Sequence, residues 1–188
     1  MPDTDSRRWF HVILTTYAAW LPGDPRGFRT RDHRQEVAGD YKQPPPPGLY
    51  DRLQRIAEES LTDRPRTFSR QQRCFVLCWL HEKLIRLGAQ IAIVAVNGRH
   101  VHLLVKLPPI RTRQEMGMVK RHVTFRLRES GDTAKVWADG AKFVPIKDRA
   151  HQVNAFKYIA DHVKEGAAVW KHGEPVPESG PGDAVAGL

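Results

Sequence analysis

QIAIVAVNGRHVHLLVK, residues 90–106, consists of two apolar runs joined by Asn97-Gly98. Asn-Gly is the dipeptide that most favours a tight hairpin turn, because both of its residues readily adopt positive φ. We therefore predict two neighbouring antiparallel strands. Side chains alternate between the faces of a strand, so His100, His102 and Leu104 share one face and the residues between them share the other.

The rest of the chain surrounds this hairpin with further strands and helices. Helices are predicted at 49–61, 69–87, 112–129 and 149–165, a first strand at 9–17, and a second, short hairpin at 134–138 and 142–146. The simplest architecture that buries every apolar stripe is α+β: a ferredoxin-like antiparallel sheet with helices covering one face.

The length predicts a single domain, since domains commonly contain about 100–200 residues. We place it at residues 1–170, with a long loop insertion at 18–47 that includes four consecutive prolines, Pro44 to Pro47. Glycine, proline and glutamate dominate residues 171–188, which we predict to be a flexible tail.

The composition is that of a basic globular protein outside the membrane. The formal net charge is +9, and an excess of this size favours a polyanionic partner, above all nucleic acid. The alternative is that the basic charge only aids solubility. No run approaches the roughly 18 apolar residues of a membrane-spanning helix. Two cysteines and an N-terminus without a signal-peptide core predict a cytoplasmic protein.

Two pairs of residues are candidates for chemistry. His100 and His102 emerge from the same face of a predicted strand, beside a tight turn, as metal ligands often do. Tyr158 and His162 are four residues apart, which places them on one face of the predicted last helix. The alternatives are two half-exposed strand histidines and an ordinary amphipathic surface pair. His11, in the first predicted strand, is expected to be structural.

Together, the two pairs resemble the paired motifs of the HUH endonucleases, specifically the small single-tyrosine transposases of insertion sequences and their REP-associated relatives. HVHLLV at 100–105 is similar to their His-hydrophobic-His strand, and YIADHVKEG at 158–166 to their Tyr-Ile-x-x-Asn-Pro-Val-Lys-x-Gly helix. Lys120 and Val136-Trp137 lie where relatives carry similar residues. The resemblance covers about residues 9–170.

The resemblance implies a metal centre and a nucleophile. The strand histidines His100 and His102 would hold a divalent metal ion, Mg²⁺ or Mn²⁺, and Tyr158 would be the nucleophile. In relatives, an amide side chain one turn after the tyrosine is the third ligand, and His162 occupies that position here. Three nitrogen ligands shift the preference from Mg²⁺ toward Mn²⁺ or later metals.

The resemblance also implies an activity and a substrate. The expected protein is a single-stranded DNA endonuclease and strand-transferase that acts through a 5′-phosphotyrosine intermediate, as in DNA transposition, on DNA that carries a hairpin. It would work as a monomer or a homodimer. The alternatives are a domesticated protein that binds DNA hairpins without cutting them and a rolling-circle replication initiator.

Two groups of residues suit DNA binding. Basic residues on one arc of the predicted helix at 112–129 could follow a phosphate backbone: Arg113, Lys120, Arg121 and Arg128. In the long loop, Trp20 could stack on a base and Arg26 could contact the backbone of a single strand. The alternatives are a solvated charged helix face and a packed turn.

Overall fold

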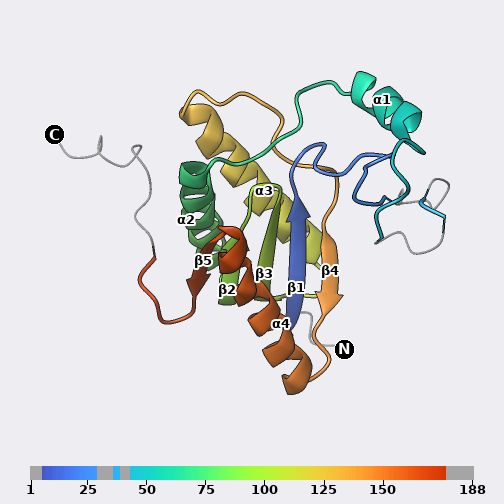
Figure 1. Cartoon of the computed structure of the whole chain (residues 1–188). Helices are drawn as coiled ribbons and strands as arrows, with labels where there is room; N and C mark the ends of the chain where they lie inside the picture. The colour runs from blue at the N-terminus through green and yellow to red at the C-terminus, as the bar shows by residue number, and fades with distance from the viewer. Residues whose placement is uncertain (1–5, 29–35, 39–42, 177–188) are drawn as a thin grey trace.

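A five-stranded antiparallel sheet forms the centre of the molecule, in the strand order β4-β1-β3-β2-β5 (Figure 1). The structure is a computed structural model that describes residues 6–28, 36–38 and 43–176. The strands are β1 (Arg8–Thr15), β2 (Gln90–Val96), β3 (His100–Leu107), β4 (Lys142–Pro145) and β5 (Ala168–Lys171). The predicted α+β class with an antiparallel sheet is confirmed.

The hairpin predicted around Asn97-Gly98 is present as β2 and β3. Ala95 of β2 pairs with His102 of β3, and on the other side of β3, Ile13 of β1 also pairs with His102. β3 is therefore the central strand, and the end that carries the histidines lies between two neighbours. This position gives the imidazoles a firm backbone support.

The described residues form four α-helices beside the sheet: α1 (Asp51–Glu59), α2 (Arg70–Arg86), α3 (Thr112–Glu129) and α4 (Arg149–Asp161). α4 continues into the short 3₁₀ helix η1 (His162–Glu165). Ser69 caps the start of α2, because its side chain accepts a hydrogen bond from the Gln72 backbone N–H. None of the helices in the described ranges has the length and apolar character needed to cross a membrane.

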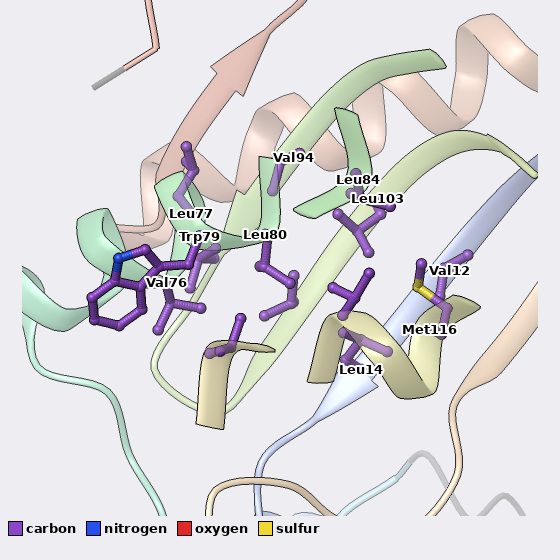
Figure 2. Packing of buried hydrophobic residues seen from close by; sticks show 14 of the residues in the cluster. Val12, Leu14, Val76, Leu77, Trp79, Leu80, Leu84, Val94, Leu103 and Met116 are labelled. Carbon is purple, nitrogen blue, oxygen red and sulfur yellow. The ribbon is translucent and has the colours of Figure 1, made fainter. Parts of the chain in front are cut away.

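The main core lies between the sheet and the two long helices α2 and α3. Figure 2 shows Leu80 of α2 and Met116 of α3 packed near Leu103 of β3, all essentially inaccessible to solvent. Burying side chains of this size stabilises the fold by about 1.5–3 kcal/mol each. This face of the sheet accounts for most of the apolar burial.

The opposite face is covered as well, so the prediction of helices on one face only is wrong. Ala155 and Ile159 of α4 pack against Ile93 of β2 and Leu104 of β3, and α4 lies on the near side of the sheet in Figure 1, with α3 on the far side. Ile93 and Ala95 of β2 and Leu104 of β3 make part of this second face apolar, so it also needs a cover. α4 supplies the second one.

The predicted second hairpin is also wrong. β4 pairs with β1 rather than with residues 134–138, which contribute a single bridge between Trp137 and Thr16. β4 instead forms hydrogen bonds with the outer edge of β1, and residues 134–138 bond to the residues that follow β1. For example, the Tyr17 N–H donates to the Val136 carbonyl. Pairing with the edge of β1, which is distant in sequence, therefore forms in place of the predicted local hairpin.

β5 is a strand that the sequence analysis missed. It pairs antiparallel with β2, and its Trp170 is buried against the main core. Lys171, where the predicted tail begins, is the last residue of this strand. The remainder of the predicted tail from 177 to 188, and residues 29–35 and 39–42 of the predicted loop, lie outside the described residues.

Candidate metal and nucleophile site

The site lies where α4 crosses the histidine-bearing end of β3. His102 is buried and His100 is half-buried on the face of the sheet that α4 covers. Ile159 is fully buried in the small core beneath α4, which anchors the helix at the position between Tyr158 and His162. The packing of one isoleucine therefore brings the tyrosine and the third histidine to the strand histidines.

The three histidines predicted as metal ligands form one cluster. One ring nitrogen from each of His100, His102 and His162 lies within 4.8 Å of the others. The rings of His102 and His162 are closest, with centroids 4.3 Å apart, and those of His100 and His102 are 5.0 Å apart. Such a set could hold a metal ion, because neutral imidazole suits several divalent transition metals.

Hydrogen bonds orient two of these rings and define the free nitrogen of His162. His162 Nδ1 lies 3.0 Å from the Tyr158 carbonyl oxygen and donates to it, so its Nε2 remains for a metal. His102 Nδ1 lies 2.9 Å from His11 Nε2. If Nδ1 of His102 carries the proton, it donates to His11, and His102 Nε2 is the nitrogen available to a metal.

His11 is thus a residue of the site that the sequence analysis did not find. It lies on β1, two residues before Ile13, which pairs with His102. Alternation along β1 places His11 on the same face as Ile13, so the register would have put it near His102. That register depends on the pairing of β1 with β3, and no short sequence motif predicts this pairing.

Burial keeps the imidazoles of His11, His100 and His102 neutral. Burial, with a smaller contribution from the nearby ring of His162, lowers the pKa of His102 to about 2 and that of His11 to about 4. Burial also lowers the pKa of His100. Metal ligation requires the neutral ring, so these side chains need not lose protons to bind a metal at neutral pH.

Tyr158 lies at the rim of the cluster with 54% of its surface exposed. Its ring centroid is 4.9 Å from that of His162 and 5.5 Å from that of His102. Tyr158 therefore lies beside histidines of its own chain. Contacts at the end of the helix support this arrangement, since Asn97 Nδ2 in the β2–β3 turn donates to Glu165 Oε2 at 2.9 Å.

An open pocket of about 390 Å³ connects this cluster to the predicted DNA-binding loop. His100, His102 and Tyr158 line it together with Trp20 and Arg26. The structure thus brings the loop residues to the tyrosine, although more than 70 residues separate them from the histidines and the tyrosine along the chain.

The basic residues predicted on α3 occupy different surroundings. Arg113 is exposed and lines a second hollow next to Trp20. Lys120 is half-buried, and its Nζ donates to the carbonyls of Ala138 and Gly140 at 2.7 and 2.9 Å, which ties the turn before β4 to α3. Arg121 and Arg128 are exposed and are not among the residues that line the hollows around Trp20.

Comparison with models of protein families finds none that matches this chain, and comparison with curated proteins finds no match either. The chemistry of the site is therefore the basis for assigning a function. A cluster of imidazoles could hold a Lewis-acidic metal, and an exposed phenol beside it is a possible oxygen nucleophile.

Proposed function

We propose that this protein is a metal-dependent single-stranded DNA endonuclease and strand-transferase that acts through a 5′-phosphotyrosine intermediate, as in DNA transposition. The observation that carries the proposal is the exposed Tyr158 ring within 6 Å, by ring centroids, of two histidines of a three-histidine cluster. The proposal agrees with the resemblance to the single-tyrosine HUH transposases.

The metal would be held by His100, His102 and His162, and when bound it would polarise a non-bridging oxygen of the phosphodiester. Tyr158 Oη attacks the phosphorus, and the bond from phosphorus to the 3′ oxygen of the leaving strand breaks. The phenol proton is lost, the 3′ oxygen gains a proton, and the 5′ phosphate remains on the tyrosine. A 3′-hydroxyl of another strand can reverse these steps and rejoin the DNA.

The donor set bears on the choice of metal. The metal-binding cluster found among the described residues consists of imidazoles alone, without a carboxylate. Mg²⁺ prefers oxygen ligands, whereas imidazole suits later divalent metals. We therefore expect Mn²⁺ to support the reaction at lower concentration than Mg²⁺.

Covalent capture of DNA tests the proposal. The protein is incubated with labelled single-stranded oligonucleotides from the DNA that flanks its gene, with Mn²⁺ or Mg²⁺, and a protein–DNA adduct is scored on a denaturing gel. Tyr158→Phe should form no adduct, because it keeps the ring but lacks the hydroxyl that becomes the phosphoester.

Tyr17→Phe is the matched control, since the Tyr17 hydroxyl pairs with Thr62 away from the histidines, and this variant should form the adduct normally. An adduct formed by Tyr158→Phe would assign the nucleophile elsewhere. Hairpin binding without any adduct in the wild type would favour the non-cutting alternative.

A further inference from the structure

Two hollows of the surface meet at Trp20. The first contains the candidate nucleophile, since Tyr158 and His100 line it. The second is lined by Arg113 of α3 and Lys142 of β4. Trp20 lines both, together with Ile13, Thr15 and Ala19. Trp20 thus lies at the border that the two hollows share, where its exposed ring can contact a chain molecule that passes from the first to the second.

Trp20 is exposed but firmly held. With 54% of its surface accessible, it contributes little to the core. Its Nε1 donates to the Gly27 carbonyl at 2.9 Å, and the Arg26 guanidinium lies 4.3 Å from the indole centroid. Arg26 is fixed in turn, because it donates to Asp24 Oδ1 at 2.8 Å and to the Ala19 carbonyl at 2.9 Å.

The loop that carries Trp20 also rests on a neighbouring helix. Gly23 has φ +86°, and a Cβ there would collide with the backbone of Gln54 in α1. Only glycine therefore allows this close approach. An exposed aromatic ring fixed in this way loses little conformational freedom on binding, which makes it a good stacking surface.

The charges along this course suit a single nucleic-acid strand. Arg99 and Arg26 line the first hollow and Arg113 and Lys142 the second, where Asp139 is the one carboxylate among the lining residues. A third hollow shares Arg113 with the second and adds Lys120. Cations beside an aromatic platform match a phosphate backbone with unpaired bases, because the bases of a duplex are already stacked on each other.

We infer that a single DNA strand runs from Tyr158 over Trp20 to Arg113, with an unpaired base next to the attacked phosphodiester stacked on the Trp20 indole. This inference rests on the proposed function and adds the course of the substrate. In this arrangement Arg26 holds the Trp20 indole in place, and Arg113 contacts the phosphate backbone of the DNA.

Base stacking can be measured in the Tyr158→Phe protein, which binds without cutting. The probe is a short unstructured oligonucleotide with 2-aminopurine at successive positions around the bond that the wild type cuts. Stacking on Trp20 should quench the fluorescence at one position beside that bond. Trp20→Ala should abolish this quench and weaken binding by about 5- to 150-fold, whereas Trp20→Phe should retain most of both.

Phe125→Ala is the matched control for Trp20→Ala. Phe125 is an aromatic residue of α3 with 59% of its surface exposed, and it lines none of the three hollows. This variant should bind and quench as the parent protein does. Thermal melting of each variant checks that it is folded.

Salt dependence tests the backbone contact. Arg113→Ala should reduce the slope of log K against log salt by about 0.7, the value for one phosphate contact on a single strand. Arg86→Ala, an exposed arginine of α2 that lines none of the three hollows, should leave the slope unchanged.

The possible failures are distinguishable. If the wild type forms no adduct with any oligonucleotide, the proposed function fails. If the adduct forms but Trp20→Ala retains the quench and affinity of its parent, or Arg113→Ala retains the salt slope, the strand course is overturned while the function stands.

Discussion

The two faces of β3 have different tasks. Val101, Leu103 and Val105 point into the main core, where all three are completely buried beneath α2 and α3. His100 and His102 point to the other face, where α4 covers Leu104 and brings Tyr158 alongside. One strand of alternating side chains therefore supports the fold on one side and carries the candidate chemistry on the other.

The two faces also differ in what burial requires. An apolar side chain gains free energy simply by leaving water, whereas a buried imidazole needs a hydrogen-bond partner or a metal ion. His11 provides such a partner for His102, and the Tyr158 carbonyl provides one for His162. Changes on the core face should therefore affect stability first, and changes on the histidine face should affect metal binding and cleavage first.

The largest effect is expected from His102→Ala. This change removes the most buried ring of the cluster and one of two strand ligands, so adduct formation should fall below detection at any Mn²⁺ concentration tested. Binding of a hairpin oligonucleotide should persist, because it rests mainly on phosphate contacts. Full cleavage by a His100→Ala/His102→Ala double variant would refute the metal assignment.

Leu103→Ala makes the complementary change on the core face. It should lower the free energy of unfolding by about 2–5 kcal/mol, because it opens a cavity beneath the long helices. Urea unfolding without metal, followed by circular dichroism, measures this value. His102→Ala should lose less in the same experiment, and the reverse order would show that the two faces do not divide the tasks in this way.

His11→Ala tests the hydrogen bond that orients His102. Loss of a residue that orients a metal ligand typically weakens metal affinity about 10- to 100-fold, and we expect this change in the dissociation constant for Mn²⁺. Isothermal titration calorimetry measures it directly. The control is His122→Ala, whose ring faces Glu82 and lies outside the cluster. Equal affinity of the His11→Ala variant and the wild type would make His11 a bystander.

The last prediction concerns the pH dependence of stability without metal. The pKa values of His11 and His102 lie at about 4 and about 2 in the folded protein, below the usual 6.5. Between pH 6.5 and 4 the unfolded chain binds protons at these rings that the native chain does not, so the free energy of unfolding falls as the pH falls.

Urea unfolding in the presence of a chelator at several pH values measures this slope. The slope should be shallower in His11→Asn, which cannot take up the proton in either state. An identical slope in this variant would show that His11 titrates normally in the folded protein.

Local signals were sufficient for much of this protein. Asn97-Gly98 predicted the central hairpin, helical periodicity predicted the helix at 69–87, and alternation along 100–105 separated the histidine face from the core face. The spacing of Tyr158 and His162 likewise placed both on one helix face. Each of these signals acts over a few residues, through backbone conformations or side-chain directions that hardly depend on the rest of the chain.

Only the tertiary structure decided the remaining features. β4 pairs with the outer edge of β1 instead of forming its predicted hairpin, and α4 covers the apolar residues on the second face of the sheet. Pairing of β1 with β3 places His11 against His102. The meeting of Trp20 with Tyr158 and Arg113 has the same origin. Such contacts join segments far apart along the chain, and they form because edges and apolar faces must be covered, which no local pattern specifies.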